Sequence, residues 1–126
     1  MGLEAGMKHT TQITAAPQHS AAALGSGDLE VLGTPALIAF LESNCKDSVR
    51  SFLPEGSTTV GIHLNFDHLK ASPIGAQITC TSEVTEVKGR LIHFRIQAES
   101  GEHIIGEGTH IRAVVDRERF LAGLNH

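Results

Sequence analysis

The sequence predicts an α+β domain in which one long helix lies against a curved antiparallel sheet. Two observations support this fold class. From residue 34 to 53 apolar side chains recur at steps of three and four, as on one face of a helix, and beyond residue 57 the period changes to two, as in strands. The 126 residues suit a single domain spanning 1–126, and 40% hydrophobic with 19% charged residues is typical of a folded protein.

The N-terminal third is expected to hold a strand, a loop and the long helix. Residues 7–16 have strand character, and the small residues and glycines of 17–33 predict a loop. Thr34 followed by Pro35 is a helix-start signal, because the hydroxyl can cap the first turn and proline is tolerated there. The predicted helix therefore begins at Thr34 and ends before Pro54 after about five turns.

Four long strands should follow the helix. Alternating apolar residues predict them in TTVGIHLNF, GAQITCTSEVTEV, RLIHFRIQA and the stretch from Ile104 to about Val115, with tight turns at VKGR and SGEH. In the first, the even positions from Val60 to Phe66 are expected on one face and Gly61 on the other. DRERFLAGL predicts a short terminal helix. One helix cannot cover such a sheet and its edges, so we expect a homodimer paired edge to edge through strands, with a tetramer as a further possibility.

Composition argues against several classes of function. A net charge of -4 without any Lys/Arg cluster disfavours nonspecific nucleic-acid binding. Apolar runs fall far short of the roughly 20 residues of a membrane span, and Cys45 and Cys80 lack the spacing of a disulfide scaffold, so we expect a cytoplasmic protein. The eight histidines show no HExxH or finger spacing, and we expect no metal. Phosphate-loop and GxSxG motifs are also missing from the sequence.

Glu42 is the first candidate for chemistry. It falls at the border of the helix's apolar stripe, beside Ile38 and Cys45. It could be a surface residue paired with Lys46 one turn on. Alternatively, it could be a partly desolvated carboxylate with a raised pKa, able to act on water or an acyl group.

His68 would follow Phe66 on the core-facing side if the strand extends that far, which is informative for a polar residue. A rim histidine at the start of a loop is the alternative. Thr34 could be a helix cap without any catalytic role, and Gly61 could simply allow the sheet to curve.

Three stretches, TPALIAFLE, VGIHLNFDHLKASPIG and GEGTHIRAVVD, together resemble the hotdog-fold thioesterases of the fluoroacetyl-CoA thioesterase-like family. In that family a Thr opens the central helix, a Glu follows eight residues later, a His lies twenty-six beyond the Glu, and a Gly precedes the His by seven. Thr34, Glu42, His68 and Gly61 stand at these spacings. The resemblance implies a dimeric hotdog fold and an acyl-CoA substrate, with no cofactor apart from the coenzyme A of the substrate.

The resemblance also implies roles. Glu42 would activate a water or attack the carbonyl, and His68 would serve as general acid or base. Thr34 would orient Glu42 or a water, or form an acyl intermediate. The backbone of Gly61 would approach the acyl group closely. The free N–H groups at the start of the helix would stabilise the oxyanion.

His110 and Arg112, within GTHIR, are expected either to meet a phosphate of the CoA or to form a structural pair at a sheet edge or dimer contact. The segment Leu24–Gly33 departs from members specialised for fluoroacetyl-CoA, which place aromatic residues there as a lid, because it has none. We therefore expect a different acyl group, with Leu29, Val31 and Leu32 shaping the mouth of the pocket.

The sequence thus favours a thioesterase that hydrolyses a small or medium acyl-CoA. Two alternatives use the same fold: a noncatalytic module that binds acyl-CoA or an acyl carrier, and a hydratase or dehydratase whose acid/base pair lies over the acyl chain. The acyl group and the choice between CoA and a carrier protein stay open at this point.

Overall fold

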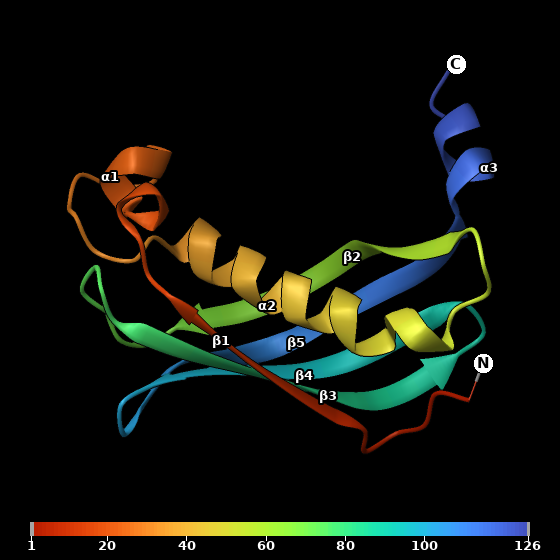
Figure 1. Cartoon of the computed structure of the whole chain (residues 1–126), viewed down its shortest axis with the longest axis horizontal. Helices are drawn as coiled ribbons and strands as arrows, with labels where there is room; N and C mark the ends of the chain where they lie inside the picture. The colour runs from red at the N-terminus through yellow and green to blue at the C-terminus, as the bar shows by residue number, and fades with distance from the viewer. Residues whose placement is uncertain (1, 126) are drawn as a thin grey trace.

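Five antiparallel strands form one sheet that curves around a long helix (Figure 1). The computed structural model describes residues 2–125. The strands lie in the order β1-β3-β4-β5-β2 and have these bounds: β1 Lys8–Thr14, β2 Ser57–His68, β3 Gln77–Lys88, β4 Leu91–Ser100 and β5 His103–Asp116. β1 and β2 are therefore the two edges of the sheet.

The long helix α2 (Thr34–Val49) runs along the concave side of the sheet and continues into a 3-10 turn, η2 (Arg50–Phe52). A short helix, α3 (Arg117–Ala122), follows β5 as expected and stands away from the sheet in Figure 1. None of the helices within residues 2–125 has the length and apolar character needed to cross a membrane.

The segment predicted as a loop contains two short helical turns, η1 (Pro17–His19) and α1 (Ala21–Leu24). The hydroxyl of Ser20 accepts a hydrogen bond from the backbone N–H of Ala23, which caps α1. α1 ends at Gly25, whose left-handed conformation suits glycine. The loop prediction was therefore wrong for these residues, because a run of alanines between a good cap and a glycine favours a helical turn.

Both predicted hairpin turns are confirmed. Two residues separate β3 from β4, and two separate β4 from β5. The first loop residue in each case is a glycine, Gly89 or Gly101, with a φ of 61°. A positive φ at this position followed by a negative one is the pattern of a type II′ turn, which matches the twist of the flanking strands.

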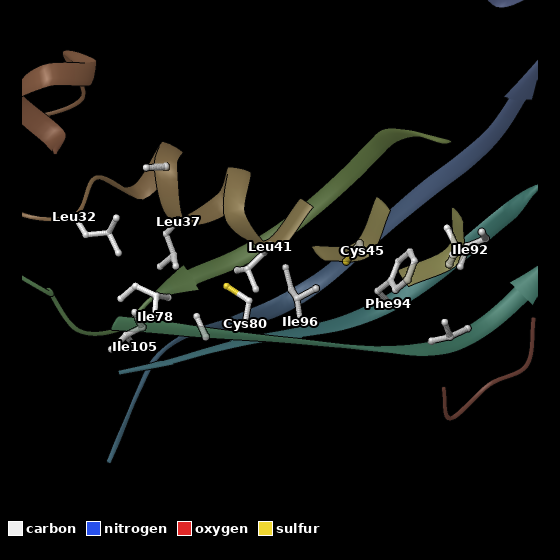
Figure 2. Packing of buried hydrophobic residues seen from close by; sticks show 14 of the residues in the cluster. Leu32, Leu37, Leu41, Cys45, Ile78, Cys80, Ile92, Phe94, Ile96 and Ile105 are labelled. Atoms are coloured by element: carbon white, nitrogen blue, oxygen red, sulfur yellow. The ribbon is translucent and has the colours of Figure 1, made fainter. Parts of the chain in front are cut away.

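The core lies between α2 and the sheet. Leu37, Leu41, Cys45 and Val49 of α2 are fully buried. In Figure 2 the side chains of Leu37, Leu41 and Cys45 point toward buried residues of β3 and β4, namely Ile78, Cys80, Ile92, Phe94 and Ile96. Each buried leucine contributes about 1.5–3 kcal/mol of burial free energy, so this contact fixes the helix on the sheet.

Asn44 also lies on the buried side of α2, with 1% of its surface exposed. Its Nδ2 donates to the carbonyl of His9 at 3.2 Å, to Thr11 Oγ1 at 3.0 Å and to the carbonyl of Cys80 at 3.2 Å. These bonds tie the middle of the helix to β1 and β3, on the side away from β2. They leave the opposite side of α2 free to face β2, where the candidate site residues lie.

β2 has an irregularity that the sequence analysis did not predict. Gly61 is opposite Arg112 of β5 and His63 is opposite Ile111, so Ile62 is an extra residue in a β-bulge. The bulge reverses the alternation of faces, and Gly61 therefore shares the helix-facing side with Leu64. The expectation that Gly61 and Leu64 lie on opposite faces was wrong for this reason.

Candidate active site

Thr34 and His68 form one half of the candidate site. Oγ1 of Thr34 is 2.8 Å from Nδ1 of His68, which is the last residue of β2. Thr34 is the first residue of α2, but Gly33 occupies the capping position and makes no side-chain cap. The interpretation of Thr34 as a helix cap was therefore wrong, and its hydroxyl is bonded to the imidazole instead.

Partial burial lowers the pKa of His68 below its usual value, while an interaction with the Lys70 backbone acts in the opposite direction. The ring is consequently neutral near pH 7 and able to accept a proton. Its other nitrogen, Nε2, is buried and has no hydrogen-bond partner within residues 2–125. A buried ring nitrogen without a partner is uncommon and suggests that something outside the single chain meets it.

A cavity of about 290 Å³ opens beside this pair. It is lined by Ala21, Ser26, Val31, Leu32, Gly33, Thr34, His68, Leu69, Lys70 and Ala71. Of the three residues expected to shape the mouth of the acyl pocket, Val31 and Leu32 line this cavity, whereas Leu29 is 68% exposed and does not. The walls are about equally polar and apolar, and the polar side chains among them are Ser26, Thr34, His68 and Lys70.

Glu42 belongs to a second cluster, nearer the middle of α2. Its Oε2 is 3.4 Å from Nη1 of Arg112 and 3.7 Å from Nε2 of His110, and 41% of its side chain is exposed. Lys46 contacts Asp47 at 3.8 Å instead. The structure therefore supports the interpretation of Glu42 as a partly buried, partnered carboxylate over a surface pair with Lys46.

Gly61 makes room for this cluster. A Cβ atom placed on Gly61 would lie 2.6 Å from Oε2 of Glu42, 3.1 Å from Cε1 of His110 and 3.3 Å from Nη1 of Arg112. A contact of 2.6 Å is too short for a carbon atom, so a side chain here would displace the carboxylate. Glycine at this position therefore lets the Glu42 carboxylate lie close to the backbone of β2, a role beyond sheet curvature.

The two clusters are separate within one chain. Thr34 and Glu42 are eight residues apart on α2, which is about 12 Å along the helix axis. Glu42 does not line the cavity beside Thr34 and His68. The folded chain thus brings together two of the three predicted catalytic residues and places the third with Gly61, His110 and Arg112.

His110 and Arg112 are buried, with exposed fractions of 2% and 6%. Thr59, which the sequence analysis missed, bonds to Arg112 through Oγ1 at 2.7 Å and through its carbonyl oxygen at 3.0 Å. Thr59 has the parity of the strand face that was expected to point away from the core, so no pattern in the sequence marks it as a site residue. It could have been found only if the bulge at Ile62 had been recognised.

The two cysteines are not candidates for the nucleophile. Burial raises the pKa of Cys45 to about 12 and that of Cys80 to about 11. Both thiols therefore stay protonated and weakly nucleophilic at neutral pH. Among the residues that the structure describes, no group of three or more His, Cys, Asp or Glu side chains is arranged to hold a metal ion.

Known proteins are similar to this chain in sequence and in fold. A family model described as "Fluoroacetyl-CoA-specific thioesterase" matches residues 15–118. The fluoroacetyl-CoA thioesterase of Streptantibioticus cattleyicolor is 34% identical over 93 residues, which cover 74% of this chain and 67% of that protein.

Solved structures agree with this assignment. One of the fluoroacetyl-CoA thioesterase FlK superposes with a TM-score of 0.93 at 28% identity, over 98% of this chain and 96% of that one. A hot-dog-like protein from Thermanaerovibrio acidaminovorans has a TM-score of 0.87 at 18% identity, over 95% and 89% of the two chains, and supports the hotdog fold alone. The predicted fold class is confirmed, and the chain belongs to the fluoroacetyl-CoA-specific thioesterase family.

Proposed function

We propose that the protein is an acyl-CoA thioesterase that hydrolyses the thioester of a small or medium acyl-CoA. Family membership supports the reaction, and a structure of the relative FlK in complex with fluoroacetate and CoA supports the class of substrate. The observation that carries the proposal is the 2.8 Å contact between Thr34 and His68, which both line a cavity. It places an imidazole with a lowered pKa at the first turn of α2.

This end of α2 suits the chemistry of a thioester carbonyl. Attack on the carbonyl creates an oxyanion, and the N-terminus of a helix offers backbone N–H groups and the positive end of its dipole. His68 acts on water or on the departing thiolate as the acid or base. The Thr34 hydroxyl holds the imidazole in place.

Glu42 supplies the carboxylate that acts on the carbonyl, directly or through a water. Glu42 lies about 12 Å along the axis of α2 from Thr34, and it does not line the cavity beside Thr34 and His68 of its own chain. We therefore propose that the functional unit is a homodimer in which Glu42 of one subunit serves the Thr34 and His68 of the other.

The edge strand β2 supports this dimer. Its outer side has no neighbouring strand within residues 2–125, and its bulge residue Ile62 is 54% exposed. A long edge strand with exposed apolar residues is a template for pairing with another strand. A second copy of β2, running antiparallel, would pair the backbone groups and extend the sheet across both subunits.

One register satisfies the side chains. With Asn65 opposite its own copy, Leu64 lies opposite the partner's Phe66 and His63 lies opposite the partner's Asp67. The first pair joins two half-buried apolar residues, and the second joins an imidazole to a carboxylate. Residues paired across antiparallel strands share a face, and these pairs do so.

This register also completes the site. Three positions before Asn65, the bulge adds an extra residue to β2. Ile62 and Gly61 therefore both lie opposite a single residue of the other strand, the partner's His68. Glu42 lies over Gly61 of its own chain, so this register brings its carboxylate beside the imidazole of the partner's His68. The unpartnered Nε2 of His68 supports this arrangement, because the subunit interface or a substrate held there would supply its partner.

His110 and Arg112 contribute to the site through buried contacts with Glu42. Both are buried behind Glu42, so we propose that Arg112 holds the carboxylate in place and does not meet a phosphate of the CoA. The two free thiols, Cys45 and Cys80, are consistent with the reducing cytoplasm, where we place the protein.

Thiol release from a panel of acetyl-, butyryl-, hexanoyl- and fluoroacetyl-CoA tests the function. Wild-type protein should hydrolyse at least one member, and Glu42→Gln and His68→Ala should each lower kcat by roughly 10²–10⁴-fold. Glu102→Gln, which changes an exposed carboxylate in a hairpin turn, is the matched control and should match wild type. Binding of CoA without turnover of any member would contradict the proposal and favour a noncatalytic module.

A further inference from the structure

The guanidinium of Arg112 is held on several sides by groups that do not themselves face the cavity. Its Nε donates to Oγ1 of Thr59 at 2.7 Å, and its Nη2 donates to the carbonyl oxygen of Thr59 at 3.0 Å. Its Nη1 is 3.2 Å from Nε2 of His110. Thr59 and His110 are 5% and 2% exposed, so these bonds are formed out of contact with water.

The hydrogen-bond roles of His110 follow from its other nitrogen. Nδ1 is 2.8 Å from the carbonyl oxygen of His63, which can only accept, so Nδ1 carries the proton. In the neutral ring Nε2 is therefore an acceptor, and Nη1 of Arg112 donates to it. Burial lowers the pKa of His110 and Arg112 lowers it further, against the His63 carbonyl and Glu42, which raise it.

Fixing the guanidinium also fixes Glu42. The contacts of Glu42 with Arg112 and His110 both involve Oε2, and they lie over Gly61, where a Cβ would be 2.6 Å from that oxygen. The Glu42 side chain is 41% exposed, so solvent or a substrate can reach it while Oε2 is held from the protein side. A guanidinium that moved would carry the carboxylate with it.

We infer that Thr59 and His110 are positioning residues, which hold the Arg112 guanidinium so that it aims the Glu42 carboxylate at the thioester. This inference rests on the proposed function, in which Glu42 acts on the carbonyl. Such a role predicts a loss of kcat with little change in KM, because the substrate still binds while the carboxylate is misplaced. A purely structural role would lower stability and leave kcat of the folded protein unchanged.

The test uses the full-length protein and the panel member that wild type hydrolyses fastest. Thr59→Val keeps the shape but removes the hydroxyl, and it should lower kcat by about tenfold or more with KM within about threefold. Thr59→Ser retains the hydroxyl and should recover most of the activity. Thr58→Val is the control, because Thr58 precedes Thr59 on β2 and points to the other face of the sheet. If Thr59→Val fails to fold, Thr59→Ala replaces it with the same expectations.

A double-mutant cycle shows whether Thr59 acts through Arg112. Lysine at position 112 has no Nε–H for the threonine hydroxyl, so adding Thr59→Val to Arg112→Lys should cause no further loss of kcat. Independent, multiplying losses would overturn the inference. So would a wild-type kcat in Thr59→Val while Glu42→Gln is inactive, a result that leaves the proposed function intact. Full activity in Glu42→Gln would remove Glu42 from the mechanism and overturn the inference with it, whereas failure of wild type to release thiol from any panel member would overturn the proposed function itself.

Discussion

The first turn of α2 and the middle of the same helix hold their polar side chains in different ways. At the first turn, exposed Thr34 and half-buried His68 are joined by a single 2.8 Å hydrogen bond beside an open cavity. In the middle, Glu42 contacts Arg112, which is itself held by buried neighbours from β2 and β5. The first arrangement leaves its groups free to move with a substrate, and the second fixes a carboxylate in advance.

The difference indicates that the two regions have separate roles in the reaction. A neutral imidazole that transfers protons needs access to water and the leaving group. A carboxylate that approaches a carbonyl needs a defined position, because small errors of placement cost much of the rate.

Gly61→Ala should lower kcat by roughly 10²-fold, because the added Cβ would force Oε2 of Glu42 out of its position. Gly56→Ala is not a suitable control, since Gly56 has a positive φ of 84° and would be strained. Ile62→Ala, at the neighbouring bulge position, is the control instead. It shows how much kcat falls when the proposed dimer is weakened, and gel filtration with light scattering measures the oligomeric state of both variants. Wild-type kcat in dimeric Gly61→Ala would show that the middle of the helix is not preorganised.

Thr34→Ala should lower kcat by about tenfold, the worth of one hydrogen bond to a reacting group, and leave stability nearly unchanged because the hydroxyl does not cap α2. Asp116→Ala provides the contrast. The Asp116 side chain caps α3 by accepting from the Arg119 N–H, so its loss should cost about 0.5–2 kcal/mol without slowing the reaction. Urea unfolding and steady-state kinetics measure the two effects. A stability loss in Thr34→Ala equal to that in Asp116→Ala would restore the capping interpretation.

The smallest effect concerns the dependence of stability on pH. The pKa of His68 is lowered in the folded protein, so the unfolded chain binds more protons than the native state as the pH falls below about 6.5. The stability that a neutral His68 contributes is full above that pH and is lost as the pH falls through the folded pKa. Urea unfolding from pH 7.5 to pH 5 should therefore show a shallower decline in His68→Gln than in wild type. Exposed His103→Gln is the control, and identical declines in all three would contradict the prediction.

Local sequence patterns were sufficient to predict most of the fold. The start of α2 at Thr34, the extension of β2 to His68 and the hairpin glycines Gly89 and Gly101 all depend on residues near one another in the chain. The apolar periods of two and three to four then indicate which faces are buried. These features were predictable because local geometry determines them.

The candidate site was predictable only in part. The resemblance to the family pointed to Thr34, Glu42 and His68, but the bulge at Ile62 has no local signal and reversed the face assigned to Gly61. The contact of Glu42 with Arg112 joins residues seventy positions apart in the sequence, and the role of Thr59 depends on it. Non-local contacts of this kind depend on strand register, which a single sequence does not reveal.

Subunit complementation tests whether Glu42 and His68 of one site come from different subunits. Glu42→Gln and His68→Ala proteins, each inactive alone, are mixed, dissociated and allowed to reassociate. If each site takes Glu42 from one subunit and His68 from the other, every mixed dimer regains one intact site, and random pairing restores about one quarter of the wild-type activity. If one chain supplies both residues, no mixed dimer has an intact site, and activity that stays at the level of the two parents would contradict the shared site.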